Sequence, residues 1–95
     1  MIEFKDQEMY VSGKIAYDNA EQIYLNGLKM IQTENKFPLT VNLSNLQHGS
    51  TLVLSVLVQW LRQTPNQQGL QFKAVPEKMM KIIQACHLQD DLKII

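Results

Sequence analysis

The sequence predicts a single α/β domain over residues 1–95, with a mixed, mostly parallel β-sheet and helices packed on one side of it. The first observation is that short segments of alternating apolar residues are interleaved with longer segments whose apolar residues recur at helical spacing, in the order ββαβαβαβ. The second is that 45% of the 95 residues are hydrophobic, which is enough to bury one modest core without disulfides or a structural metal. Because strands joined through helices pair in parallel with right-handed crossovers, an antiparallel edge is expected only at the N-terminus.

The N-terminal third is expected to form a hairpin followed by a helix. Residues 2–5 and 9–15 have the apolar alternation of two short strands, and the letters KDQE between them suit a turn. Asp18 and Glu21 have the spacing of a capping box, in which two side chains satisfy free backbone N–H groups at a helix start. Apolar residues follow at helical spacing, so a helix is predicted over about 18–33.

The middle of the chain is predicted to form a strand followed by an apolar helix. Residues 39–44 alternate apolar and polar side chains, which suits a strand. Ser50 and Thr51 stand directly before an almost unbroken apolar run, and both are preferred helix caps that stabilise by about 1 kcal/mol. At least one of them is therefore interpreted as the cap of a helix that ends before Pro65.

The last third is predicted to add two strands and one more helix. Residues 70–75 suit a strand, and Pro76 is expected to begin a helix because proline is tolerated in a first turn. Met79 and Cys86 are seven residues apart on the same apolar face, so Cys86 is interpreted as core filling. The letters LKII at the end of the sequence suit a final strand.

Charge and composition exclude several classes of partner. Nine basic residues balance nine acidic ones, so there is no electrostatic footprint for nucleic acid and no basic segment that would hold an anionic membrane. The apolar run over 52–61 is far shorter than a membrane span, and the N-terminus has no apolar stretch of signal-peptide length. The single cysteine permits no internal disulfide, so a cytoplasmic location is expected.

The residues that could carry chemistry form no recognised catalytic or cofactor motif. His48 and His87 are far apart and belong to no ligand-spaced pair, so no metal site is expected. The glycines are scattered rather than grouped in a phosphate-binding loop, so no nucleotide cofactor is expected. Ser50 and Thr51 lack the Gly-x-Ser-x-Gly surroundings of a nucleophile, and Cys86 lacks a suitably placed base. The chain is therefore expected not to be an enzyme.

The helix that follows Ser50 and Thr51 has more apolar side chains than one core face can use. One set at helical spacing is expected to face the sheet: Leu54, Leu57, Val58 and Leu61. A second set forms another stripe: Val53, Val56 and Trp60. An exposed stripe that contains a tryptophan is a candidate binding surface for a partner protein or a second copy of the chain. The alternative left open is that Trp60 packs on the neighbouring helix and closes the core.

The segment LTVNLSNLQHGSTLVLSVLVQWL resembles the signature region of the STAS domain family, the fold of bacterial anti-sigma-factor antagonists and sulfate-transporter tails. In that family a strand reading hydrophobic-Asp-Leu-Ser leads through a short loop into Asp-Ser/Thr-x-Gly-Leu and a helix. Here Asn42 replaces the Asp of the strand and Ser50 the Asp of the motif, while Leu52 and Val53 stand where small residues are usual. The resemblance also covers VSGKI and GLQFKAVPEKMMKIIQACHL, and it implies a STAS-like fold.

Within this family the sequence is most similar to the small cytoplasmic subunits of phospholipid-transport ABC complexes that maintain outer-membrane lipid asymmetry. The resemblance implies a non-enzymatic accessory subunit that binds and stabilises or regulates the ATPase subunit, in a complex with permease and lipid-binding subunits. The ATPase subunit would hold any ATP and magnesium, and the chain would lie at the inner membrane through the complex, without direct insertion. Thr51 is placed by resemblance at the docking surface, and the candidate contacts around it are Ser50, Leu52, Val53, Val56 and Trp60.

A second function is left open by the same family. An anti-sigma-factor antagonist binds a kinase-type anti-sigma factor and is switched by phosphorylation. Its acceptor hydroxyl maps to Leu52, a side chain that cannot be phosphorylated. This function would therefore require Ser50 or Thr51 as an unusual acceptor.

Overall fold

In the computed structural model of the protein, which describes residues 2–34, 36–64 and 69–95, the chain starts with the expected hairpin. Strand β1 (Ile2–Lys5) pairs antiparallel with β2 (Glu8–Val11). The two residues between them, Asp6 and Gln7, have positive φ angles of 53° and 64°. This combination is typical of the two-residue hairpin turn whose twist matches that of the flanking strands.

Three parallel strands extend the hairpin into a five-stranded sheet of order β1-β2-β4-β6-β7. They are β4 (Leu39–Asn42), β6 (Leu70–Lys73) and β7 (Lys93–Ile94), and each pairs in parallel with the strand before it in that order. Every crossover moves in the same direction across the sheet, so right-handed connections place their helices on one face. The predicted mixed, mostly parallel sheet is confirmed.

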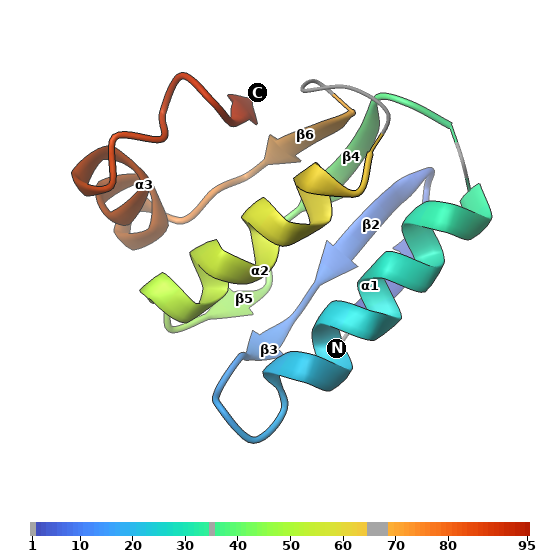
Figure 1. Cartoon of the computed structure of the whole chain (residues 1–95), viewed down its shortest axis with the longest axis horizontal. Coiled ribbons are helices and arrows are strands. Elements are labelled where there is room, and N and C mark those ends of the chain that lie inside the picture. Colours follow the sequence, from blue (N-terminus) through green and yellow to red (C-terminus); the bar gives the residue numbers. More distant parts are fainter. Residues whose placement is uncertain (1, 35, 65–68) are drawn as a thin grey trace.

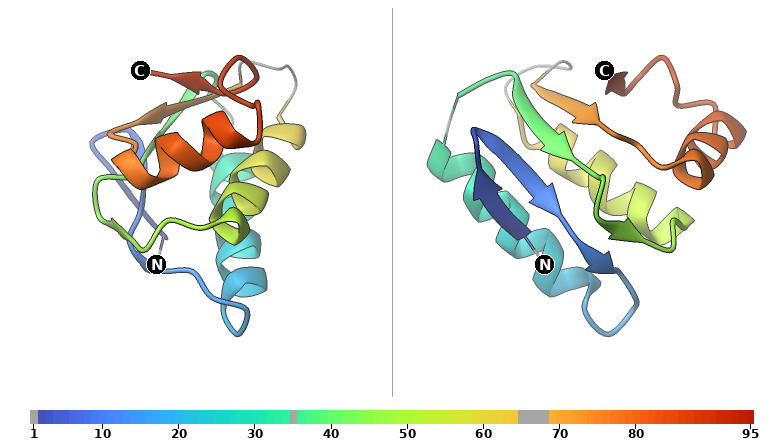
Figure 2. Two further views of the ribbon diagram at one scale, coloured as in Figure 1. Left: turned by 90° about the vertical axis from the view of Figure 1, so that its left-hand side faces the viewer. Right: turned by 180° about the vertical axis from the view of Figure 1, so that it is seen from behind.

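Helices α1 (Ala20–Glu34) and α2 (Thr51–Arg62) lie side by side across one face of the sheet (Figure 1). They run in the same direction, so their N-termini lie at the same end of the domain (Figures 1 and 2). Helix α3 (Glu77–Ala85) lies beside the N-terminal part of α2. The predicted breaker Pro65 lies outside the described residues, and α2 ends at Arg62 with Gln63 as its C-cap.

A small second sheet stands at the end of the domain where α2 begins. It contains β3 (Gly13–Lys14) and β5 (Leu46–Gln47), which pair in parallel. The prediction of one continuous strand over 9–15 is therefore wrong, because the chain leaves the main sheet after Val11. Gly13, with a φ of 85°, allows the change of direction, and its N–H donates to the carbonyl of Asn45 at 3.2 Å.

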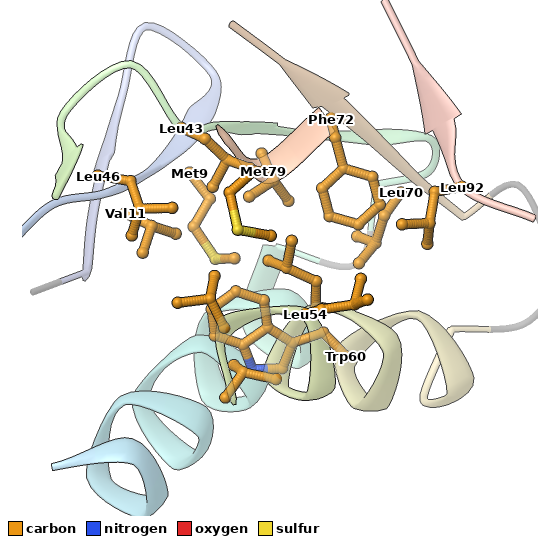
Figure 3. Close-up of a cluster of buried hydrophobic side chains, with 14 of the residues drawn as sticks. Met9, Val11, Leu43, Leu46, Leu54, Trp60, Leu70, Phe72, Met79 and Leu92 are labelled. Carbon is orange, nitrogen blue, oxygen red and sulfur yellow. The ribbon is translucent and has the colours of Figure 1, made fainter. Parts of the chain in front are cut away.

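The hydrophobic core fills the space between the helices and one face of the sheet (Figure 3). Alternate residues of the central strands face it, and Met9, Val41 and Phe72 are each no more than 1% exposed. The residues between them point to the other face, which is polar and which no described helix covers: Glu8, Tyr10, Thr40, Asn42, Gln71 and Lys73. Of these, only Asn42 is buried. A sheet with one packed and one solvated face is the expected form for a fold with helices on one side.

The start of α1 differs from the prediction. The helix begins at Ala20, so Asn19 rather than Asp18 stands at its N-cap position. The Asn19 side chain turns back into the preceding loop, where its Oδ1 accepts from the N–H of Ala16 at 2.8 Å and its Nδ2 donates to the carbonyl of Lys14 at 2.9 Å. The predicted Asp18 capping box is wrong, because the asparagine fixes a loop that occupies the first positions assigned to the helix.

The interpretation of Cys86 as core filling is also wrong. Helix α3 ends at Ala85, and Cys86 is its C-cap, with φ −91° and ψ 5°. The side chain is exposed, whereas Met79 and Ile83 on the same helix are buried. Helical spacing places a residue on the apolar face only while the helix continues, and here it stops one residue too early.

Candidate docking surface at the start of α2

Ser50 caps α2. Its backbone is extended, with φ −158° and ψ 170°, and its Oγ accepts a hydrogen bond from the N–H of Val53 at 3.3 Å. Its carbonyl accepts the first helical hydrogen bond from the N–H of Leu54 at 3.2 Å. The interpretation of one hydroxyl of the Ser50-Thr51 pair as a helix cap is confirmed. The Ser50 hydroxyl is occupied by its hydrogen bond from the N–H of Val53.

Thr51 is the first residue of the helix and is exposed. Among the described residues, none forms a hydrogen bond with its hydroxyl. The first backbone N–H groups of a helix have no partner within it, and this end of the helix has positive partial charge. Thr51 therefore offers a free hydroxyl next to unpaired N–H groups, with the half-buried Leu52 beside it.

The loop that leads to Ser50 is held from two sides. On one side it continues from β5, which is paired with β3. On the other side Gly49 is buried against Met79 of α3, and a Cβ atom at Gly49 would lie 2.8 Å from the Cγ and Sδ atoms of Met79. The residue between them, His48, has a φ of 56° in the left-handed region. The structure therefore gives Ser50 and Thr51 a fixed position relative to three elements.

The prediction of an exposed stripe on α2 is wrong. Val53 and Trp60 are 0% exposed, and Val56 is 4% exposed. Helix α1 covers Trp60: its Nε1–H donates to the carbonyl of Tyr24 at 2.9 Å, and the indole lies on Gly27, where a Cβ atom would overlap the ring. Trp60 closes the core between the two helices (Figure 3), so these three residues cannot contact a partner in the folded domain.

The stripe predicted to face the sheet is only half buried. Leu54 and Leu57 are 4% and 1% exposed, whereas Val58 and Leu61 are partly exposed at the edge of the buried arc. The solvent side of α2 is polar: Thr51, Ser55, Gln59 and Arg62. Of the six residues predicted to bind a partner, Ser50, Thr51 and Leu52 are accessible in whole or in part, and they lie together at the start of the helix.

A polar network at the end of β4 was not predicted from the sequence. The buried Asn42 donates through Nδ2 to Glu8 Oε1 at 3.0 Å and accepts at Oδ1 from the N–H of Ser44 at 2.9 Å. The Lys73 Nζ group donates to Glu8 Oε2 at 2.9 Å. The pKa of Glu8 is lowered, mainly by the hydrogen bond from Lys73 and next by that from Asn42. The hydrogen bond to Glu8 in turn raises the pKa of Lys73. An aspartate at position 42 would therefore place a second carboxylate against the carboxylate of Glu8.

The described residues contain neither a clustered metal site nor a membrane-spanning helix. Over 2–34, 36–64 and 69–95, no group of three or more His, Cys, Asp or Glu side chains is placed to hold a metal ion. In the same part of the chain, no helix is long and apolar enough to cross a membrane.

Comparison with known families and structures identifies the fold. A family model described as "Mlab, STAS domain" matches residues 1–95. The chain belongs to the STAS domain family. This finding confirms the resemblance seen in the segment from β4 to α2 and the predicted fold class.

Two solved chains are similar to this one over almost the whole sequence. One, from the Acinetobacter MlaFEDB complex in an ATP-bound Vtrans1 conformation, is 59% identical with a TM-score of 0.92, and each chain covers 100% of the other. The other, from the same complex in an ATP-bound Vtrans2 conformation, is 62% identical with a TM-score of 0.89 over 95% of both chains. This STAS domain is thus similar to a component of an MlaFEDB complex.

A more distant STAS-like structure shows the fold alone. An anti-sigma factor antagonist from Mycobacterium paratuberculosis is 19% identical with a TM-score of 0.72, and the match covers 99% of this chain and 81% of that one. No curated protein matches the chain. Sequence identity is therefore high to the MlaFEDB chains and low to the antagonist.

Proposed function

We propose that this STAS domain is a non-enzymatic, cytoplasmic accessory subunit of an Mla-type ABC transporter that moves phospholipid and maintains outer-membrane lipid asymmetry. It binds the ATPase subunit, corresponding to an MlaF-like protein, and stabilises or regulates it. The observation that carries the proposal is 59% identity over the full length of both chains to a component of the Acinetobacter MlaFEDB complex. Through that complex, with its permease and lipid-binding subunits, the domain is held at the inner membrane.

The docking contact is centred on Thr51. Its exposed hydroxyl and the free N–H groups at the start of α2 can hydrogen-bond a polar group of the ATPase subunit, while Leu52 adds apolar contact. Ser50 supports this surface through its hydrogen bond to Val53. The buried Trp60 acts at a distance, by fixing α2 against α1.

The mechanism that suits such a surface is differential affinity. An accessory subunit that binds one conformation of the ATPase more tightly than another stabilises that conformation, by as much as the difference in binding free energy. The two similar solved chains come from ATP-bound conformations, which supports the ATP-bound state as one to which the domain is bound. ATP and magnesium are held by the ATPase subunit in this proposal.

The proposal is tested by co-expressing the tagged chain with the ATPase, permease and lipid-binding subunits of an Mla-type complex. The chain is expected to purify with the ATPase subunit, and the rate of ATP hydrolysis with and without the chain shows whether it activates. A tagged chain that elutes alone, and that gains the mass of a phosphate on incubation with an anti-sigma kinase and ATP, would overturn the proposal in favour of the antagonist function.

A further inference from the structure

Tyr17 is the most exposed large apolar side chain in the described part of the chain. It is 93% exposed, compared with 56% for Ile95 and 48% for Leu25. The residue lies in the loop between β3 and α1, in the letters AYDNA. A tyrosine side chain can bury about 150–250 Å² on binding, so Tyr17 offers a large solvent-exposed area for contact with a partner.

The loop that presents Tyr17 is tightly bonded. The carbonyl of Ala16 accepts from the N–H groups of Asn19 at 3.1 Å and Ala20 at 2.8 Å. The Asn19 side chain adds its two hydrogen bonds, from the N–H of Ala16 and to the carbonyl of Lys14. On the β3 side of the loop, Ile15 is buried in the core. The ring is therefore held outward by a fixed backbone, and little ordering of the loop is required when a partner covers it.

Tyr17 and Thr51 lie at the same end of the domain. Strands β3 and β5 are paired in parallel, so the loops that follow them leave the same edge of that small sheet. Each loop leads into the N-terminus of a helix, α1 after Tyr17 and α2 at Thr51, and the two helices have their N-termini at the same end of the domain (Figures 1 and 2). The loop that contains Tyr17 and the start of α2 that contains Thr51 therefore lie at the same end of the domain.

We propose that Tyr17 is an anchor residue of the interface with the ATPase subunit, in which that subunit buries its exposed ring. This inference rests on the proposed function and extends the docking surface from the start of α2 to the loop before α1. Interfaces concentrate their binding free energy in a few such side chains, among which tyrosine is enriched. The surrounding Lys14 and Asp18 are both exposed and of opposite charge, so the contact depends on the ring rather than on net charge.

A protein fits this surface better than a lipid bilayer. Attachment to an anionic bilayer requires a basic cluster or an apolar helix face beside the aromatic residue. At Tyr17 the neighbouring basic residue, Lys14, is offset by Asp18. Binding to vesicles is therefore an outcome that the test must exclude.

The test measures the dissociation constant between the full chain and the purified ATPase subunit for matched variants. Tyr17→Ser is expected to weaken binding by at least about 30-fold, the scale of an interface hot spot, whereas Tyr17→Phe stays within about threefold because it keeps the ring. Tyr10→Ser, on the open face of the sheet, is the matched control and is expected to bind like the wild type. Asn19→Ala keeps the ring but loosens the loop, so its dissociation constant is expected to lie between those of the wild type and Tyr17→Ser.

The outcomes separate this inference from the proposed function. If the wild-type chain does not bind the ATPase subunit, the proposed function fails and the inference fails with it. If the wild-type chain binds and Thr51→Glu does not, but Tyr17→Ser binds like the wild type, the inference alone is overturned. It is also overturned if Tyr17→Ser keeps full affinity for the ATPase but loses binding to vesicles of phosphatidylethanolamine and phosphatidylglycerol.

Discussion

Two parts of α2 have different roles although they begin at neighbouring residues, Leu52 and Val53. Thr51 and Leu52 at its start are accessible, whereas Val53, Val56 and Trp60 are buried, and Trp60 packs on α1. The apolar stripe that looked like a binding surface stabilises the fold, and the polar residue at its edge is free for a partner. Apolar content alone therefore does not mark an interface in a small domain, because a neighbouring helix can use the same side chains.

The largest expected effect comes from the buried side of this comparison. Trp60→Ala removes a fully buried indole and leaves the Tyr24 carbonyl without its donor, so the free energy of unfolding should fall by about 3–5 kcal/mol. Denaturant unfolding of the isolated chain measures this change. A variant that unfolds like the wild type but no longer binds the ATPase subunit would show that Trp60 is an interface residue after all.

A smaller effect is expected on the polar face of the sheet, where it tests whether the hydrogen bond from Asn42 to Glu8 stabilises the fold. Asn42→Asp replaces a donor to Glu8 with a second carboxylate, and the free energy of unfolding at pH 7 should fall by about 1–3 kcal/mol. Two adjacent carboxylates raise the pKa of one of them, so the loss is full above that raised pKa and shrinks as pH falls through it.

The rescue variant for Asn42→Asp is Glu8→Gln in the same chain. It removes the like charge and offers an amide donor to the new carboxylate, so most of the lost stability should return. If the double variant is as unstable as Asn42→Asp alone, the contact with Glu8 does not explain the asparagine at this position.

The two hydroxyls at the start of α2 should differ in how much they contribute to the stability of the domain. Ser50→Ala removes the cap on the N–H of Val53 and should lower the free energy of unfolding by about 1 kcal/mol. Thr51→Ala removes no hydrogen bond within the described residues and should stay within about 0.5 kcal/mol of the wild type. Thermal unfolding of both variants checks the difference, and equal losses would mean that the hydroxyls share the cap.

Local patterns in the sequence predicted most of the fold. The hairpin and the cap at Ser50 depend on residues within a few positions of one another, so the sequence could place them. The parallel pairing followed from the alternation of strands and helices along the chain. The exposure of Thr51 also follows from its place beside the cap. The docking role of Thr51 stays a prediction.

The errors came from features that depend on contacts distant in the chain or on where an element stops. The spacing of Val53, Val56 and Trp60 showed that they share a face, but not that α1 covers it. A signal was present in Gly27, which interrupts an otherwise amphipathic helix and leaves room for the indole. Cys86 was misplaced because α3 ends one residue before it, and no residue type marks that end.

The most direct test of the division within α2 is one pair of measurements on Thr51→Glu. An acidic residue in the first turn of a helix is favoured by the helix dipole, so thermal stability should be unchanged or slightly higher. The same charge placed in the docking contact should weaken binding to the ATPase subunit by at least about 30-fold, the scale of an interface hot spot. The control Gln32→Glu adds the same charge on the exposed side of α1, near its other end, and should bind like the wild type. Wild-type affinity for Thr51→Glu would contradict the account.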